Sequence, residues 1–207
     1  MTAAIRNCAF ALAAVLTLTN LSVGPAFAGP AEDAAEAFAA EQKGDFPTAL
    51  RLYRTAALAG NTYAQGNLGT MYHTGKGGPK NFTEALRWYT EAAKANYADS
   101  QFNLGIMNEL GEGMKQDFAA AAKWYRLAAE QGYVPAQTAL GTLTAAGGPG
   151  VTPDRGEAYK WFVIAAAKGD DQAKKRMAAI AGRLTPEQKA KAEKDAADFK
   201  PKEAAKK

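Results

Sequence analysis

The chain has 207 residues and a net charge of +4, with one histidine and one cysteine. A single histidine excludes a multi-histidine metal site, and it leaves a histidine-based catalytic pair only if His73 acts with a carboxylate. Residues 29–182 carry 16 acidic and 16 basic side chains, so the positive excess, apart from Arg6, falls in the last 25 residues. Because a nucleic-acid-binding protein is expected to show a basic patch on its folded part, this balance argues against that class.

Residues 1–28 are typical of a cleaved signal peptide. Arg6 gives a basic start, residues 8–18 form an apolar run, and Ala26-Phe27-Ala28 fits a small-x-small cleavage site. The run is too short to span a bilayer, and an uncleaved interfacial anchor is the alternative. Cleavage near Ala28 would remove the only cysteine, Cys8, so the mature chain would have no disulfide and no thiolate ligand. We expect a periplasmic or secreted protein without an integral membrane span.

Residues 29–60 are predicted to form a helix pair at the start of the domain. A first helix is expected over residues 30–43, with Ala35 and Phe38 facing inward. Asp45 is the predicted N-cap of a second helix of similar length. This pair is expected to act as a partial, capping repeat.

Residues 61–182 repeat with a period of about 36 residues, in which two kinds of helix alternate. The first kind carries a Leu-Gly pair, and the second carries a tryptophan next to Tyr or Phe. Self-similarity at this period is typical of a solenoid, in which each unit buries its apolar face against its neighbours. The Leu-Gly helices are expected at residues 62–73, 98–109, 135–145 and 171–181, and the last of them has Met177-Ala178 in place of Leu-Gly. The tryptophan helices are expected at residues 82–95, 118–131 and 155–168.

The recurring residues indicate how these helices pack. In the Leu-Gly helices, apolar positions recur at i, i+4 and i+7, as at Ala64, Leu68 and Met71, which is one helical face. A glycine follows each leucine at a cost of about 1 kcal/mol of helix propensity, so we expect it to allow close helix approach. The glycines are Gly69, Gly105 and Gly141. The recurring tryptophans predict core packing rather than exposed ligand platforms: Trp88, Trp124 and Trp161.

Residues 183–207 are predicted to cap the solenoid. Thr185, Pro186 and Gln188 form a helix start with a capping box, and the helix is expected to run to about Phe199. The lysines of this segment predict a solubilising, frayed tail, with binding to an anionic envelope surface as the alternative. The sequence leaves open whether the chain's own end, through Phe199, occupies a groove.

Two strings define the repeat most sharply. Residues 64–72 read Ala-Gln-Gly-Asn-Leu-Gly-Thr-Met-Tyr, and residues 85–93 read Ala-Leu-Arg-Trp-Tyr-Thr-Glu-Ala-Ala. With its recurrences over about residues 45–181, this cycle resembles the Sel1-like repeat (SLR) family, a relative of the tetratricopeptide repeats. The resemblance implies an all-α, right-handed α-solenoid of antiparallel helix pairs with about ten helices, whose concave face is lined by the Leu-Gly helices.

The resemblance also implies adaptor work between proteins rather than a shared reaction. We therefore expect an exported, monomeric, non-enzymatic module without cofactor or metal, which binds a protein or peptide partner in its concave groove. Regulation of an envelope sensor or assembly of an envelope complex is the expected use. Two alternatives remain, a cell-wall or membrane-surface binding protein that uses the basic tail and a secreted host-interaction factor.

The predicted partner-binding site consists of the residues that flank the buried stripe of the Leu-Gly helices. In the middle unit Phe102 and Ile106 would form an apolar anchor point, with Asn67 and Asn103 holding the backbone of a partner. The alternative is that Phe102 and Ile106 pack between helices. The full predicted set is Tyr63, Asn67, Thr70, His73, Phe102, Asn103, Ile106, Glu109, Thr138 and Thr142.

Overall fold

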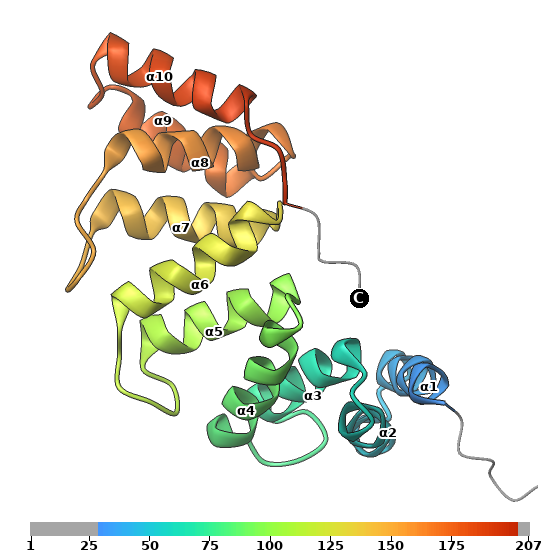
Figure 1. The fold of residues 1–207 in the computed structure, drawn as a ribbon. Helices are drawn as coiled ribbons and strands as arrows, with labels where there is room; N and C mark the ends of the chain where they lie inside the picture. The colour runs from blue at the N-terminus through green and yellow to red at the C-terminus, as the bar shows by residue number, and fades with distance from the viewer. Residues whose placement is uncertain (1–28, 203–207) are drawn as a thin grey trace, which may run out of the picture.

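Ten α-helices make up residues 29–202, the part of the chain that the computed structural model describes (Figure 1). The one additional regular feature in this part is an isolated antiparallel bridge between Gly148 and Val151. The predicted all-α fold of ten helices is confirmed, whereas the predicted signal peptide lies outside the described residues. The helices are α1 Pro30–Gln42, α2 Phe46–Leu58, α3 Thr62–Thr74, α4 Phe82–Lys94, α5 Ala98–Leu110, α6 Phe118–Glu130, α7 Val134–Ala146, α8 Arg155–Ala167, α9 Asp171–Ala181 and α10 Pro186–Ala197.

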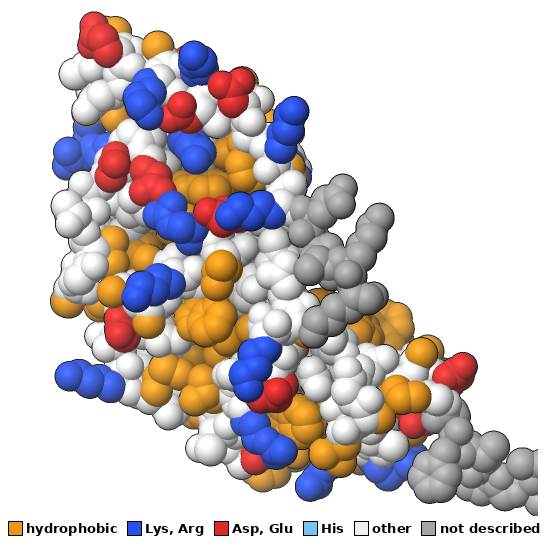
Figure 2. Space-filling view, viewed as in Figure 1, with side chains coloured by type: hydrophobic (Ala, Val, Ile, Leu, Met, Phe, Trp, Pro, Cys, Tyr) orange, Lys and Arg blue, Asp and Glu red, His pale blue; other side chains and the backbone are white. Residues whose placement is uncertain are grey.

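The helices stack as pairs into a solenoid (Figure 1). Within the pairs, α1 packs on α2, α3 on α4, α5 on α6 and α7 on α8, and each even helix up to α8 also packs on the next odd one. The stack thereby buries a continuous core, as repeat proteins do. At the far end α10 packs on α8. On the side seen in Figure 2, charged side chains of both signs are interspersed with apolar surface.

Local side-chain caps fix where most helices begin. In seven of the ten helices an Asn, Asp or Thr side chain accepts a hydrogen bond from a backbone N–H of the first turn. Asp117, for example, accepts from the N–H of Ala120 at 2.8 Å. At helix ends, Asn96 and Gly132 occupy equivalent positions with φ of 63° and 84°, which stops the helix. Local caps and stop residues therefore set the helix boundaries of the repeats.

The glycine of each Leu-Gly pair makes room for an aromatic ring of the following helix. A Cβ atom on Gly69 would lie 2.6 Å from the ring of Tyr89, and one on Gly141 would lie 2.7 Å from the ring of Phe162. These distances are far inside van der Waals contact, so a larger residue would displace a buried ring. The predicted close approach is thus between the glycine backbone and a side chain, rather than between two helix backbones.

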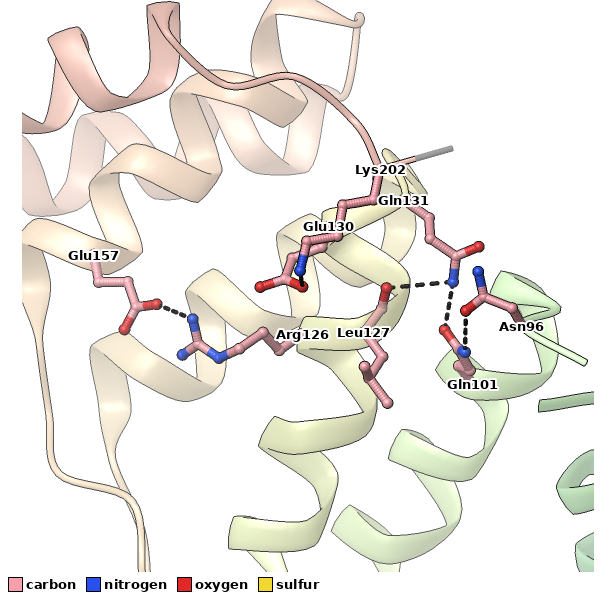
Figure 3. Close-up of polar contacts among 8 residues, drawn as sticks. All are labelled: Asn96, Gln101, Arg126, Leu127, Glu130, Gln131, Glu157 and Lys202. Carbon is pink, nitrogen blue, oxygen red and sulfur yellow. Dashed lines mark hydrogen bonds and ion pairs between the residues drawn. The ribbon is translucent and has the colours of Figure 1, made fainter. Parts of the chain in front are cut away.

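A glutamine that recurs in three repeats ties each Leu-Gly helix to the helix before it. The side-chain amides donate to backbone carbonyls eight residues earlier: Gln65 to Ala57 at 3.2 Å, Gln101 to Ala93 at 3.4 Å and Gln137 to Ala129 at 3.1 Å. These carbonyls lie in the last turn of a helix and already accept a backbone N–H from the residues that follow it, so each glutamine amide adds a second hydrogen bond. Gln101 also donates to the Asn96 side chain and accepts from Gln131 (Figure 3). The glutamines therefore lock successive repeats together.

The first helix packs with a different face from the predicted one. Phe38 is 45% exposed and Ala35 is exposed as well, whereas Ala34, Ala37 and Ala40 face the core. The prediction that Ala35 and Phe38 face inward was wrong. Because alanine occupies so many positions of α1, hydrophobicity alone does not select one face, and the small alanines allow α1 to lie close to α2.

The C-terminal segment folds back onto the solenoid as far as Lys202, so the predicted frayed tail is wrong for this part. The Phe199 ring packs edge-on against Trp161 of α8, with ring centroids 5.5 Å apart. The backbone N–H of Lys202 donates to the Glu130 carbonyl at 2.8 Å, and its ammonium pairs with the Glu130 carboxylate (Figure 3). Phe199 is therefore engaged by Trp161 and not by a groove of the Leu-Gly helices.

Ser100 buries a hydroxyl without a partner. The side chain is fully buried, its oxygen makes no hydrogen bond among the described residues, and the equivalent positions in the neighbouring repeats are Ala64 and Ala136. An unpaired buried hydroxyl costs about 1–3 kcal/mol. We expect Ser100→Ala to raise the free energy of unfolding by about 1 kcal/mol in urea denaturation. A loss of stability would show that the hydroxyl has a partner in solution.

An ion pair between Arg126 of α6 and Glu157 of α8 joins neighbouring repeats, with 2.5 Å between Nη1 and Oε1 (Figure 3). Burial raises the pKa of the Glu157 carboxyl, but the hydrogen bond and charge of Arg126 outweigh burial and hold that pKa below its usual value. A carboxylate whose pKa is lowered in the folded state adds stability above its unfolded pKa, and this stability is lost as the pH falls through the folded pKa.

We therefore expect Glu157→Gln to lower the midpoint of thermal unfolding at pH 7. The difference from the wild type should narrow as the pH is lowered from about 7 toward about 3, because protonation then removes the same charge from the wild type. Glu91→Gln is the matched control, since Glu91 pairs with Lys94 on an exposed part of α4 and such pairs contribute little. A difference that stays constant with pH would show that Glu157 acts through packing alone.

Candidate functional site

The Leu-Gly helices line one side of the solenoid, since α3 touches α5 directly and α7 touches α9. All ten residues of the predicted partner-binding site lie on α3, α5 and α7. Nine of them are half-buried, and Tyr63 is the most open, at 39% exposed. Their side chains therefore rest against the helices and keep one edge toward solvent. We call this side the groove.

Tyrosines of the tryptophan helices α4 and α6 reach under the groove and form hydrogen bonds with two of the predicted residues. The Tyr89 hydroxyl donates to the Thr70 hydroxyl at 3.1 Å, and the Tyr125 hydroxyl donates to the Glu109 carboxylate at 2.6 Å. Burial raises the pKa of both tyrosines, so their hydroxyls keep the proton and remain donors at neutral pH. Thr70 and Glu109 are thus oriented before any partner binds.

Asn67 and Asn103 already form hydrogen bonds within their own helices. The side-chain amide of Asn67 donates to the Tyr63 carbonyl at 2.9 Å. That of Asn103 donates to the carbonyl and the carboxylate of Asp99, at 3.0 and 2.9 Å. If these residues hold the backbone of a partner, as predicted, their side-chain carbonyl oxygens are the atoms suited to the task, because the N–H groups would first have to break these bonds.

Thr138 and Thr142 lie where α7 faces α9. The Thr138 hydroxyl donates to the Asp170 carboxylate at 2.7 Å, and the Thr142 hydroxyl donates to the Thr138 carbonyl at 2.8 Å. Burial raises the pKa of Asp170, but the hydrogen bonds from Thr138 and from the first turn of α9 outweigh burial and lower it. Asp170 is therefore an anion at neutral pH, and Thr138 links two repeats besides lining the groove.

His73 pairs with Glu112 of the next repeat, with 2.7 Å between Nε2 and Oε2. The carboxylate required for a histidine-based catalytic pair is therefore present. The rings of Phe82 and Tyr89 lie edge-on to the imidazole, with centroids 5.6 and 6.0 Å away. Acid–base catalysis by this pair would also need a reacting group within reach of His73 and donors for the charge that develops. The contacts described for His73, with Glu112, Phe82 and Tyr89, are those of a structural link between repeats.

The sequence left open whether Phe102 and Ile106 face the groove or pack between helices, and in the structure they do both. The Phe102 ring lies 5.5 Å from that of Tyr133 and 5.7 Å from that of Tyr125, centroid to centroid. Both residues pack on the cluster between α6 and α7, yet both are only half-buried. They pack between helices and keep an edge toward the groove. Replacing them with small polar residues would therefore reduce stability as well as any binding.

A hollow of about 310 Å³ between α5, α7 and α9 brings together Glu109, Thr138 and Thr142 of the predicted set. Arg176 of α9 lines the same hollow and was missed by the sequence prediction. In the repeat alignment, Arg176 is the equivalent of Asn103 two repeats later. The alignment could therefore have predicted it, but the Leu-Gly pair that marks the alignment is absent from α9. We call this hollow the groove hollow.

Two larger hollows, of about 370 and 440 Å³, lie between α8 and α10. Their walls carry charges of both signs, and several are already paired, such as Lys191 with Asp195 at 2.6 Å. Figure 2 shows the same interspersed charges over this end of the molecule. The groove is taken as the candidate site because predicted residues from two repeats converge on its hollow, although that hollow is smaller.

Stacked helix pairs with a groove along one side define a helical repeat protein. The model of the Sel1 repeat family matches residues 39–61, 62–97, 98–133 and 134–170, more than half of the chain. The chain therefore belongs to the Sel1 repeat family, and the predicted resemblance is confirmed. Proteins of this family are generally interaction modules and typically non-catalytic scaffolds. No curated protein sequence matches the chain.

Two solved structures are similar to this one. A Sel1 repeat protein from Oxalobacter formigenes is 31% identical with a TM-score of 0.69, over 82% of this chain and 72% of the other. The protein c5321, a protective antigen present in uropathogenic Escherichia coli strains that displays an SLR fold, is 26% identical with a TM-score of 0.72. That likeness covers 82% of this chain and 38% of the longer one.

Two further kinds of site are not found among residues 29–202. No three His, Cys, Asp or Glu side chains come together there as a metal site would require. None of the helices in this part is both long and apolar enough to cross a membrane.

Proposed function

We propose that this chain is an exported, non-enzymatic adaptor that binds a protein or peptide partner along the groove. Its use would be the regulation or assembly of a complex in the bacterial envelope. The observation that carries the proposal is the groove hollow, where helices of three repeats converge and Glu109 is held in place by Tyr125. Membership of the Sel1 repeat family supports a protein as the partner. The proposal requires no cofactor or metal.

A bulky side chain in the groove hollow tests the proposal. Thr142→Tyr places a ring there, at a position where the previous repeat already carries the larger Ile106. Thr83→Tyr makes the same chemical change on an exposed part of α4. In pull-downs from envelope extract at low and high salt, we expect Thr142→Tyr to lose the partner protein and Thr83→Tyr to retain it. Both variants should keep the helical content of the wild type in circular dichroism.

Capture that survives Thr142→Tyr would place the binding surface elsewhere and contradict the proposal. Thr142 is a better position for this test than Phe102 or Ile106, because those two side chains also support the packing of α6 and α7. Binding through the basic tail has less support, since Lys189, Lys191 and Lys202 pair with acidic side chains of the chain itself.

The likeness to a protective antigen favours a second candidate, a secreted factor that contacts a host. Both candidates require export of the chain, but the secreted factor would end outside the cell and the adaptor in the periplasm. We expect N-terminal sequencing of the protein from fractionated cells and medium to begin at Gly29, in keeping with cleavage after Ala28. Recovery from the medium would favour the secreted factor and recovery from the periplasm the adaptor, while an intact N-terminus in the cytosol would contradict both.

A further inference from the structure

The groove changes its chemistry at the end formed by the last repeats. A second hollow of about 270 Å³ lies between α7, α8 and α9, and it shares Thr142 and Arg176 with the groove hollow, so the two adjoin. Its lining is largely apolar, with Phe162, Ile180 and Ala145 among its residues. The groove therefore continues from a polar stretch into an apolar one.

Three arginines from three segments line this second hollow: Arg155 in the first turn of α8, Arg176 in α9 and Arg183 after α9. We call it the arginine pocket. All three arginines are exposed, and none of them forms an ion pair within residues 29–202. The pocket thus carries an excess of positive charge over an apolar floor.

The acidic side chains at the starts of α8 and α9 are already engaged. Asp154 caps α8, and Asp170 caps α9 and accepts from Thr138. Glu157 pairs with Arg126 of α6. The charge of Arg176 contributes to the lowered pKa of Asp170, but no ion pair forms between them. The guanidinium groups of the pocket therefore remain available to an anion from outside.

The repeat register explains why this pocket lacks an acidic residue of its own. The middle repeat pairs the Tyr125 hydroxyl with the Glu109 carboxylate. At the equivalent positions one repeat later, the chain carries Phe162 and Ala145, which removes both the hydroxyl and the carboxylate. The position that a carboxylate occupies in the middle repeat is therefore apolar in this one, and the arginines lie around it.

We propose that the arginine pocket binds an acidic segment of the partner protein. A carboxylate of the segment pairs with the guanidinium groups, and a neighbouring apolar side chain rests on the floor around Phe162. Guanidinium groups match carboxylates through paired hydrogen bonds, and an apolar surrounding strengthens those bonds. The inference rests on the proposed adaptor function. It adds that the bound segment of the partner is acidic and that its acidic part lies at the α9 end of the groove.

A random peptide library displayed on phage and selected on the purified protein supplies the probe. We expect the enriched peptides to combine at least two Asp or Glu residues with a Leu or Phe. A synthetic copy of one enriched peptide should bind less tightly in about 0.5 M salt. Arg176→Glu should weaken it roughly tenfold or more, and Arg176→Gln should give a smaller loss. Lys123→Glu makes the same charge change on the exposed part of α6 and should leave the affinity unchanged.

The outcomes separate this inference from the adaptor proposal. Peptides that are lost with Thr142→Tyr but are not acidic and tolerate Arg176→Glu would overturn the acidic partner and leave the adaptor standing. Peptides that tolerate both substitutions, or a selection that enriches none, would count against both. A single-stranded oligothymidine that binds more tightly than the peptides and is lost with Arg176→Glu would overturn the inference, because it assigns the pocket to the phosphates of a nucleic acid.

Discussion

Trp161→Ala should lower the free energy of unfolding by roughly 4 kcal/mol, as expected when a buried tryptophan is truncated. Trp161 is 2% exposed and belongs to the cluster between α6, α7 and α8. The Phe199 ring packs against it, and its indole N–H donates to Glu157 at 3.4 Å. Its loss would leave a cavity and release the segment after α10 as well. For a chain of this size, the midpoint of thermal unfolding should fall by about 8–16 °C.

Trp124→Ala is the matched control for this prediction. Trp124 holds the equivalent place one repeat earlier, but it is only partly buried and no C-terminal segment covers it. We expect its truncation to cost about half as much, because a partly exposed side chain loses less buried area. Urea denaturation followed by far-ultraviolet circular dichroism measures both variants without relying on tryptophan fluorescence. Equal losses would show that burial does not distinguish the two positions.

Gly105→Ala should lower the free energy of unfolding by about 2 kcal/mol, although alanine is the better helix former. A Cβ atom on Gly105 would overlap the ring of Tyr125, which is 2% exposed and therefore closely surrounded by other side chains. The ring would have to shift, and its hydroxyl would leave Glu109. The substitution should therefore also weaken any partner that depends on the orientation of Glu109. Urea denaturation and binding of a selected peptide measure the two effects.

Gly182→Ala is the control for the glycine prediction. Gly182 follows α9 with a φ of −73°, and a Cβ atom there would meet nothing within 4 Å. Alanine fits both the backbone and the space, so the stability should change by less than about 0.5 kcal/mol. If Gly105→Ala were as stable as the wild type, the recurrence of glycine in the Leu-Gly helices would need another cause.

The helices were predictable because their signals are local. Helix α6 was expected at residues 118–131 and spans Phe118–Glu130. Its bounds were predictable because Asp117 caps its start and Gly132 stops it. Where local signals are weak, the prediction failed. The many alanines of α1 gave no preferred face, and Phe38 was wrongly placed inward.

The site was predictable only as a set of positions. The register placed Glu109 and Thr142 on the groove, but the hydrogen bond from Tyr125 and the packing of Phe102 depend on how neighbouring repeats meet in space. The arginine pocket was missed because its residues come from three segments, and Arg176 lies in a helix that lacks the Leu-Gly signal. Docking of Lys202 on Glu130 joins residues 72 positions apart, which no local pattern reveals.

Nuclear magnetic resonance of the 15N-labelled protein tests most directly whether the groove is the binding surface. A peptide selected on the protein is added, and the backbone amide signals that shift are assigned. Shifts concentrated at Thr138, Thr142 and Arg176 are the predicted result, because these residues line the groove hollow. Shifts confined to α8 and α10, around Lys191 and Asp195, would place the partner in the hollow between those two helices and contradict a groove-binding adaptor.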